Sequence, residues 1–358
     1  MMGLFDLAQP ALFALSPEKA HNVSLMGLKT GIIPPASLPK DERLNVSIAD
    51  IEFPNPVGLA AGYDKNAEVP DAILKLGFGF AEVGTITPKA QPGNPKPRVF
   101  RLTGDKAIIN RLGFNNEGHA AALARLQARR ANGGIVGVNI GANKDSEDFV
   151  ADYEAGIDTF YNVASYFTAN ISSPNTPGLR NLQAAEALEV LLNRIFSRVE
   201  ENASKNSKTV PVFLKIAPDL QTSELDEIAS VVKASKLSAL IVSNTTLDRD
   251  MLKYKTHASE AGGLSGQPLF EKSTRILAEM YKRLGNAVPL IGVGGISSAQ
   301  DAISKIEAGA SLIQLYTGMV YAGPCLPSNI VKGLSKHLDQ TGSENISKLV
   351  GSKNSDWL

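Results

Sequence analysis

The densest group of residues able to do chemistry is the eleven-residue segment 170–180, NISSPNTPGLR. It follows an apolar, aromatic run at 166–169 that predicts a buried strand. Its two prolines then exclude both helix and ladder pairing, so we expect a rigid loop. This loop carries only neutral donors and acceptors before Arg180, which suits a neutral, polar, planar ligand such as a nucleobase-like ring. The same residue types form ordinary strand-to-helix turns, so the segment alone leaves both interpretations open.

Polar side chains also occur where five other predicted strands end. Burying an Asn or Lys unpaired costs on the order of several kcal/mol, so each needs a partner. One such residue is often a satisfied core group, whereas polar groups on six consecutive strands indicate a ligand. Besides segment 170–180, the residues are the segment AAGYDKN at 60–66, Thr85, Asn139, Lys215, and Ser243, Asn244 and Thr245.

Glycines after the seventh and eighth predicted strands carry a different signal. The segments are GVGGI at 292–296 and YTG at 316–318, with GGLSG at 262–266 as a further contributor. Bare backbone lets N–H groups approach an anion, and barrels favour this position for phosphate. Glycines also simply make tight turns, but the position favours a phosphate-bearing cofactor with a flat ring.

Other catalytic devices are not indicated. The four histidines are scattered without metal-ligand spacing, so we expect no metal site, and no G-x-S-x-G elbow surrounds Ser173. Cys325 is the only cysteine, which excludes an intrachain disulfide framework and fits a reducing compartment. The 36 basic and 36 acidic residues balance, so no nucleic-acid partner is expected.

Eight short apolar runs alternate with helical patterns, which predicts a (β/α)8 TIM barrel. The alternative, an open doubly wound sheet, lacks its usual GxGxxG fingerprint after the first strand. The expected strands are 57–62, 80–87, 134–141, 166–172, 212–218, 239–245, 290–296 and 312–318. The expected helices are 67–76, 116–131, 152–164, 183–203, 222–234, 270–284, 298–308 and 327–338.

The segments outside these units predict an extension, a hairpin, two lids and a tail. Residues 3–33 indicate a small helical extension of two apolar helices, the second capped by Ser16 with Pro17 at its first position. Residues 45–56 predict a hairpin that closes the barrel bottom. The long loops 88–115 and 246–268 are typical of lids or binding loops. We therefore divide the chain into a two-helix membrane and quinone-access extension (1–40), the barrel (41–338) and a polar, loosely ordered tail (339–358).

Seven motifs, in this order, strongly resemble the dihydroorotate dehydrogenase family. They are AAGYDKN (60–66), NRLGFNN (110–116), NISSPNTPGLR (170–180), LKIAPDL (214–220), SNTTLDR (243–249), GGLSGQPL (262–269) and IGVGGI (291–296). The resemblance implies an FMN-bearing barrel that oxidises (S)-dihydroorotate to orotate in de novo pyrimidine synthesis. Ser173, where the soluble classes place a cysteine base, and the helical extension are similar to the quinone-dependent class 2.

The resemblance also implies roles for individual residues. Ser173 would be the catalytic base, Lys65 would hold the substrate carboxylate, and Lys215 would place positive charge near flavin N1. A serine base needs an onward route for its proton, and our candidate first relay is Thr176, three residues along the chain, acting through water. FMN contacts would fall on Ala61, Gly62 and Lys65 in segment 61–65 and on Thr85, Asn139, Asn170, Lys215, Ser243, Gly266, Gly295, Tyr316 and Thr317. Substrate contacts would be Lys65, Asn110, Arg111, Leu112, Gly113, Phe114, Asn170, Asn175, Asn244 and Thr245. His21, Arg101 and Tyr316 would line the inner end of a quinone tunnel.

The expected partners are therefore dihydroorotate or orotate and a membrane quinone. We expect a monomer bound peripherally to the cytoplasmic side of the cell membrane. Two alternatives stay open: a soluble dihydroorotate dehydrogenase that uses fumarate or NAD, and a non-catalytic barrel that binds a phosphate ligand. The apolar helices of residues 3–33 could also simply pack on the barrel.

Overall fold

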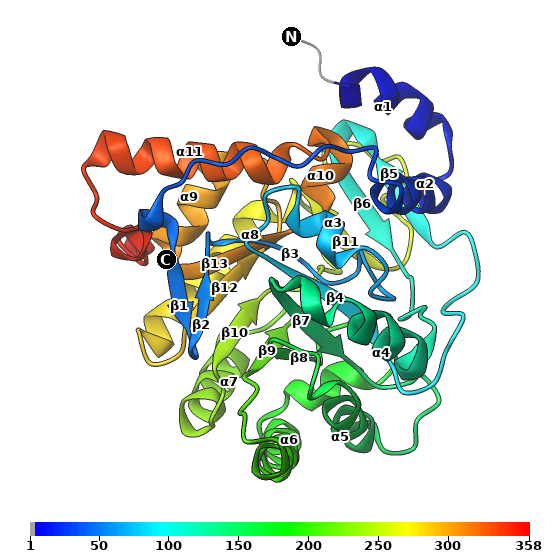
Figure 1. Cartoon of the computed structure of the whole chain (residues 1–358), viewed down its shortest axis with the longest axis vertical. Coiled ribbons are helices and arrows are strands. Elements are labelled where there is room, and N and C mark those ends of the chain that lie inside the picture. The colour runs from blue at the N-terminus through cyan, green and yellow to red at the C-terminus, as the bar shows by residue number, and fades with distance from the viewer. Residues whose placement is uncertain (1–3) are drawn as a thin grey trace.

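Eight parallel strands close into a barrel in the computed structural model, which describes residues 4–358 (Figure 1). The predicted TIM barrel is therefore confirmed, while residues 1–3 of the predicted extension lie outside the described residues. Around the barrel the strands are β3 (Val57–Leu59), β4 (Phe80–Ile86), β7 (Ile135–Ile140), β8 (Phe167–Asn170), β9 (Val212–Ile216), β10 (Ala239–Val242), β12 (Leu290–Val293) and β13 (Ala310–Leu315).

Most strands end before the predicted boundary. The sequence pattern extends the sixth strand to residue 245, for example, whereas β10 ends at Val242. Residues just beyond the strand ends, such as Ala60, Ser243 and Asn244, line the cavity described below. These post-strand residues form the candidate site.

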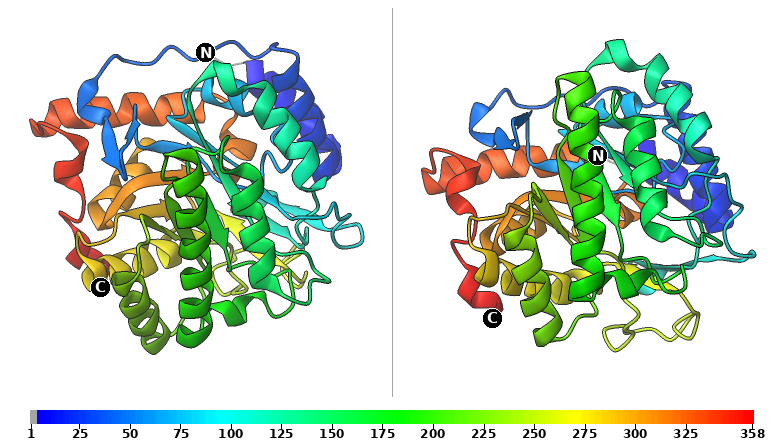
Figure 2. Two further views of the ribbon diagram at one scale, coloured as in Figure 1. Left: turned by 60° about the horizontal axis from the view of Figure 1, so that its bottom comes forward. Right: turned by 90° about the horizontal axis from the view of Figure 1, so that it is seen from below.

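Helices surround the barrel on its outside, as the two further views show (Figure 2). Their apolar faces pack on the strands, which stay buried on both faces, as expected of a parallel sheet. These helices are α3 (Pro70–Leu74), α4 (Gly118–Ala128), α5 (Phe149–Phe160), α6 (Ala185–Asn206), α7 (Thr222–Ala234), α8 (Leu269–Leu284), α9 (Ala299–Ala308), α10 (Thr317–Ala322) and α11 (Leu326–Thr341).

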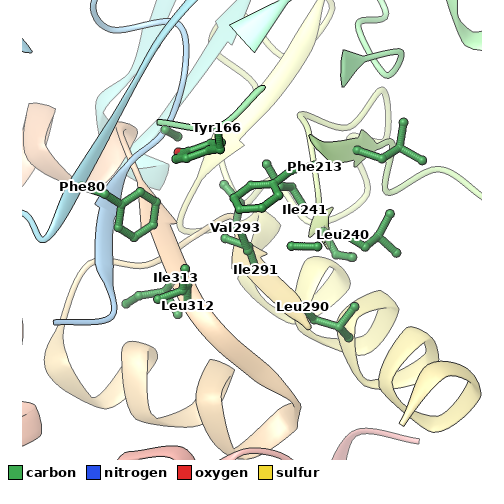
Figure 3. Close-up of a cluster of buried hydrophobic side chains, with 14 of the residues drawn as sticks. Phe80, Tyr166, Phe213, Leu240, Ile241, Leu290, Ile291, Val293, Leu312 and Ile313 are labelled. Atoms are coloured by element: carbon green, nitrogen blue, oxygen red, sulfur yellow. The ribbon is translucent and has the colours of Figure 1, made fainter. Parts of the chain in front are cut away.

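Aromatic rings fill the amino-terminal half of the barrel interior. Tyr166 stacks on Phe213 with 4.3 Å between ring centres, and Phe80 lies edge-on to Tyr166 at 6.4 Å (Figure 3). The hairpin of β1 (Val46–Ile48) and β2 (Ile51–Phe53) adds Phe53, whose ring meets Phe80 at 5.0 Å. Because Phe80 begins β4, the hairpin closes this end of the barrel, as predicted.

The two predicted lids contain regular structure that the sequence pattern did not reveal. The first holds β5 (Val99–Leu102) and β6 (Ala107–Asn110), and the second holds β11 (Gly263–Gly266). They pair as an antiparallel sheet in the order β11–β6–β5, with a small core of its own. Each strand has only four residues, and β11 is rich in glycine, so neither length nor alternation marked them as strands.

The extension consists of α1 (Leu4–Ala14) and α2 (Pro17–Lys29), as predicted (Figure 1). Ser16 stands at the cap position, but its side chain makes no capping hydrogen bond, so that detail of the prediction is wrong. Pro17 at the first helical position removes one of the N–H groups that would have no partner within the helix. Within residues 4–358, no helix has the length and apolar character needed to cross a membrane.

The expectation of a loosely ordered tail is also wrong. After α11, short 3-10 helices at Ile346–Leu349 and Asn354–Trp357 pack back on the barrel helices. Ile346 is buried, Asn354 donates to two backbone carbonyls at 2.7 and 3.0 Å, and Trp357 meets Phe270 edge-on at 5.9 Å. Few apolar residues occur in this stretch, so its composition did not predict that Ile346 and Trp357 would pack against the barrel helices.

Candidate active site

One cavity of about 1150 Å³ opens over the carboxyl ends of the barrel strands and continues beneath α1 and α2. Both groups of residues that the sequence analysis assigned to the site line this cavity: those at the strand ends and those of the helical extension. The lining includes, among the predicted site residues, Ala61, Gly62, Lys65, Thr85, Asn110, Leu112, Gly113, Phe114, Asn170, Ser173, Asn175, Lys215, Ser243, Asn244, Thr245, Gly266, Gly295, Tyr316 and Thr317, with His21 and Arg101.

Three predicted site residues do not line this cavity. Asn139 is fully buried behind Thr85, whose hydroxyl donates a hydrogen bond to Asn139 Oδ1 at 2.6 Å. The Arg111 guanidinium turns away, pairing with Glu260 at 2.7 Å and lying over the Phe100 ring. Thr176 is also buried outside the lining. The predicted contact of the Arg111 side chain with substrate therefore lacks support, because its charge is already paired.

A buried carboxylate that the sequence analysis missed organises the polar layer under the cavity. Glu82 of β4 is fully buried, and its carboxylate accepts from Asn139 at 2.7 Å and Gln314 at 2.8 Å. Thr168 and Tyr166 donate to it as well, at 3.0 and 3.3 Å. The layer continues upward, since Asn139 and Thr85 both accept from the Asn170 amide. The sequence did contain a signal for this role, because Glu82 is the one acidic residue inside the apolar run of the predicted second strand.

Two lysines give the cavity its positive charge. Burial lowers the pKa of Lys65 to about 8, and no carboxylate in the described residues contacts its ammonium. Burial also lowers the pKa of Lys215 on β9, while the Glu82 charge opposes that shift. Two desolvated cations in one cavity favour an anionic or electron-rich ligand between them.

The segment that carries Lys65 is held by its neighbour Asp64. The Asp64 carboxylate accepts from the backbone N–H groups of Glu68 at 2.7 Å and Val69 at 2.8 Å. Burial raises the Asp64 pKa, and these two hydrogen bonds oppose that shift. The side chain therefore acts as an internal brace for the turn after β3.

The segment 170–180 forms the loop that the sequence predicted. Ser173 is buried, and its Oγ accepts from the Asn175 N–H at 3.2 Å. Asn244, after β10, donates to Ser172 Oγ at 3.0 Å, which links the loops after β8 and β10. Asn175 in turn donates to the Asn110 carbonyl at 3.3 Å. Three of the predicted substrate asparagines are thus brought to one region of the cavity.

Arg180 clamps this loop, a role that the sequence analysis did not assign. Its guanidinium donates to the carbonyls of Ser172 and Thr245 and to the Asp219 carboxylate, each at 3.2 Å. Burial alone would raise the pKa of Asp219, but hydrogen bonds from Lys272 and Thr246 hold it below its usual range. The clamp is therefore ionised and fixed at both ends.

Aromatic and basic side chains from the extension and the barrel meet at the inner end of the cavity. His21 of α2 lies edge-on to Tyr63 at 5.1 Å, and its Nδ1 is 3.5 Å from the Tyr316 hydroxyl. Arg101 donates to the Phe13 carbonyl at 3.1 Å, while its Nε is buried without a partner among residues 4–358. The three predicted tunnel residues therefore lie on one cavity, and Tyr63 joins them.

Burial sets the charge states of this aromatic group. It lowers the pKa of His21 to about 3, with the Lys65 charge adding to the effect. Burial likewise raises the pKa of Tyr63 to about 12. Both rings are neutral near pH 7, so this part of the cavity suits an uncharged ligand.

Glycine is required at the turn after β12. Gly295 has φ +78°, and a Cβ there would lie 2.4 Å from Phe270 Cβ. Its backbone lines the cavity, as does Gly266, where an added Cβ would lie 2.4 Å from the Lys106 carbonyl oxygen. These two positions keep backbone exposed to a ligand, as the anion-site prediction requires. In residues 4–358, no group of three or more metal-ligating side chains is assembled.

Comparisons with known proteins agree over nearly the whole chain. The family model described as Dihydroorotate dehydrogenase matches residues 43–338. A protein of Allorhizobium ampelinum named Dihydroorotate dehydrogenase (quinone) is 61% identical over 350 residues, which cover 98% of this chain and 96% of that protein. A Brucella ovis protein of the same name is 59% identical over 358 residues, which cover 100% and 98%.

Solved structures agree with the barrel and its extension. DHODH from Eimeria tenella in complex with ferulenol has a TM-score of 0.90 and 39% identity, covering 96% of this chain and 98% of that one. The ligand-free form has a TM-score of 0.89 and 41% identity, covering 94% and 99%. With a family model that matches most of the chain and relatives about 60% identical along its full length, this protein belongs to the flavin-dependent dihydroorotate dehydrogenase family.

Proposed function

We infer that this protein oxidises (S)-dihydroorotate to orotate in pyrimidine biosynthesis and delivers the electrons to a quinone. The whole-chain relatives named Dihydroorotate dehydrogenase (quinone) support the reaction and its acceptor. The observation that carries the proposal is the continuity of the cavity. It joins the strand-end residues around Ser173 to the surfaces of α1 and α2, so one space serves both substrate and acceptor.

Lys65 and the asparagines would bind the substrate. The Lys65 ammonium, which lacks a carboxylate partner in residues 4–358, would pair with the substrate carboxylate through charge-assisted hydrogen bonds. Asn110, Asn175 and Asn244 each donate and accept, which matches alternating C=O and N–H groups on the ring edge. Their linked loops would hold that edge in register.

The cofactor proposed for the site is FMN. Lys215 would lie near flavin N1, and the bare backbone at Gly266 and Gly295 would receive the phosphate. These features fit a planar, phosphate-bearing group. When bound, FMN would supply the acceptor for the hydride from substrate C6. The remaining contacts stay as predicted: Ala61, Gly62, Lys65, Thr85, Asn139, Asn170, Ser243, Tyr316 and Thr317, with Asn139 acting through Thr85.

Ser173 would take the proton from substrate C5. A serine hydroxyl is a weak base by itself, so the proton needs an onward route. Thr176 remains the proposed first relay, three residues along the same loop. The Asn175 N–H already donates to Ser173 Oγ, which leaves the serine proton free to point toward Thr176 or a water between them.

The extension would give the quinone its entry. Leu7, Met26 and Ile32 are 66%, 64% and 74% exposed, so this short segment presents several large apolar side chains to its surroundings. We propose that this face of α1 and α2 rests in the bilayer interface on the cytoplasmic side, with the protein a peripheral monomer. His21, Arg101 and Tyr316 would then meet the quinone head at the inner end of the cavity.

An anaerobic spectroscopic titration tests this function. The purified protein is expected to be yellow, to bleach with dihydroorotate, and to recover its colour with a long-tailed quinone. Recovery with fumarate or NAD at a comparable rate would instead identify the soluble alternative. A colourless protein that no dihydroorotate changes would leave only the phosphate-binding barrel.

A further inference from the structure

Lys305 is a fully buried lysine for which the proposed reaction has no use. It lies on α9, and its side chain is 0% exposed. Its Nζ donates to Ser273 Oγ at 2.7 Å and lies 5.2 Å from the centre of the Phe270 ring. Among residues 4–358 its ammonium pairs with no carboxylate. A hydroxyl and a ring face are weak compensation for a desolvated charge.

The nearest acidic group does not neutralise this ammonium. Asp301 stands one helical turn earlier, but its carboxylate accepts from both the N–H and the hydroxyl of Ser297, at 2.8 and 2.9 Å. Burial therefore lowers the pKa of Lys305 well below its usual value, and Asp301 only partly opposes the shift. A packing role would be served as well by an apolar side chain of the same volume. Without a partner, burial favours the neutral amine, so an anion supplied from outside the chain would restore the ammonium form.

The two contacts of Lys305 are the residues on which the Gly294–Gly295 turn rests. Ser273 Oγ donates toward the Gly294 carbonyl at 3.2 Å, while a Cβ on Gly295 would lie 2.5 Å from Phe270 Cα. The other side of this turn lines the large cavity. Lys305 thus lies directly behind the wall where the cofactor phosphate is proposed to bind.

A hydrogen-bonded chain connects the ammonium to that wall. The ammonium donates to Ser273, whose single hydroxyl proton is shared between the carbonyls of Phe270 at 3.1 Å and Gly294 at 3.2 Å. The Gly294 carbonyl shares a peptide group with the Gly295 N–H. In a trans peptide the N–H points opposite to the C=O, and therefore away from Ser273. Successive hydrogen bonds polarise one another, which makes that N–H a stronger donor to an anion.

We propose that Lys305 is the buried counter-charge of the cofactor phosphate, acting through the Ser273–Gly294 chain rather than by contact. The inference rests on the proposed function, in which FMN binds with its phosphate at the Gly294–Gly295 turn. Lys305 is then a positioning residue. Its charge would also act through space, because the intervening protein excludes water and screens it weakly.

Comparing FMN with riboflavin isolates this effect, because the two flavins differ only in the phosphate. Full-length wild type, Lys305→Met and Lys282→Met are each loaded with one flavin and diluted, and flavin release is followed by fluorescence. Lys282 is an exposed lysine of α8, so its variant matches the charge change away from the turn. For Lys305→Met the FMN dissociation constant should rise about tenfold to a hundredfold, with riboflavin unchanged. Lys282→Met should leave both constants unchanged.

Each other outcome has a defined meaning. Equal weakening of both flavins, or an unchanged preference for FMN, would show that Lys305 only packs and would overturn the proposal. A wild-type protein that holds riboflavin as tightly as FMN would instead overturn the FMN assignment itself. If Lys305→Met does not fold, Ser273→Ala keeps the lysine but breaks the chain. It should weaken FMN alone by several-fold, and an unchanged FMN preference there would also refute the mechanism.

Discussion

Ser173 and Lys65 carry the chemistry at the scale of the residue, and both depend on what surrounds them. Ser173 Oγ has a backbone N–H donor at 3.2 Å, and within residues 4–358 no charged side chain hydrogen-bonds it. Lys65 has a pKa near 8 because it is desolvated, with Glu18, Asp64 and Glu68 only partly offsetting that cost. Each side chain is poised for a ligand rather than for a partner in the protein.

Replacing Ser173 by Ala should slow flavin reduction by dihydroorotate roughly 10²–10⁴-fold, the usual contribution of a general base. Flavin content and orotate affinity should stay near wild type, because the hydroxyl is not proposed to hold either ligand. Stopped-flow absorbance measures the rate. Ser173→Cys should recover part of it, with a pH profile that follows thiol ionisation near pH 8.5. Near-normal reduction in the alanine variant at neutral pH would remove Ser173 from the base role.

Orotate affinity should depend on the protonation of Lys65. Only the ammonium form pairs with a carboxylate, and the free-enzyme pKa is about 8. Affinity should therefore be constant below pH 7 and fall as the pH rises through about 8. Calorimetric titrations across this range measure it, and Lys65→Met should bind weakly with no such pH dependence. An unchanged affinity in that variant would show that another group holds the carboxylate.

At the scale of the element, two features shape the site. Arg180 links the loops that follow β8 and β10, and the helices α1 and α2 cover the cavity. The Arg180 guanidinium ties the loop after β8 to the loop after β10, with Asp219 as its anchor. The extension is tied in the same way. Arg98, from the segment before β5, donates to Glu18 of α2 at 2.7 Å.

Arg180→Lys should loosen the catalytic loop while keeping the charge. Lysine cannot reproduce a planar guanidinium that reaches two carbonyls and a carboxylate together. We expect flavin reduction to slow about tenfold to a hundredfold, since small misplacement of reacting groups has effects of that order. Arg283→Lys is the matched control, because Arg283 pairs with Glu279 and Asp226 on the outer helices. Equal rates for the two variants would argue against the clamp.

Charging the apolar face of the extension should separate the two half-reactions. Met26→Glu with Ile32→Glu places two carboxylates on exposed positions, so folding should be unaffected. Liposome binding and reoxidation by a long-tailed quinone should fall together, while reduction by dihydroorotate and reoxidation by a small soluble acceptor persist. Val190→Glu, an exposed apolar position on α6, is the control. Wild-type turnover with membrane-bound quinone in the double variant would contradict the proposed interface.

Removing residues 1–33 is a harsher form of the same test. The barrel begins at Val57 and carries the substrate loops, so dihydroorotate should still reduce the flavin in a single turnover. Reoxidation by a lipid-bound quinone should fail. Circular dichroism must first establish folding, because loss of the Glu18–Arg98 pair uncovers the cavity.

At the scale of the whole molecule, stability should decrease on the acid side of neutrality. Burial lowers the pKa of His119, on α4 against Phe160, to about 4. The unfolded chain takes up this proton near pH 6.5, so it binds more protons than the fold between pH 6.5 and 4. Full stability is therefore present above pH 6.5 and is lost as the pH falls toward 4, by at most about 3 kcal/mol from His119.

Urea denaturation at pH 7.0, 5.5 and 4.5 measures this loss. His119→Gln should flatten the curve between these values relative to wild type. Asp64, whose pKa burial raises, contributes with the opposite sign in both proteins and cancels in the comparison. Parallel curves for wild type and variant would show that His119 is protonated in the fold.

The strand pattern and the loop residues were predictable because they are local. Eight apolar runs predicted the barrel, and the polar residues that follow them predicted a shared edge, since parallel strands end on one face. The prolines and neutral polar groups of segment 170–180 predicted a rigid loop, but by themselves left open whether it binds a ligand or forms an ordinary turn. The resemblance to the family supplied the roles of Ser173 and Lys65.

Other parts of the site depend on partners distant in sequence. β6 pairs with its neighbour β5 and also with β11, whose Gly263 lies opposite Asn110 although the two residues are far apart in the chain. Arg111 was predicted to meet substrate, but Glu260 takes its charge. The tail from residue 346 folds because Ile346 and Trp357 find pockets between distant helices.

The sequence by itself determined the barrel, the site edge, the extension and the identity of most polar groups at the cavity. The tertiary structure alone decided which of them keep an unpaired charge. Lys65 and Lys305 are both lysines near glycines and acids in the sequence, yet their carboxylate neighbours are engaged elsewhere in the fold. Desolvation and the direction of hydrogen bonds depend on all surrounding elements at once, so a local pattern does not contain them.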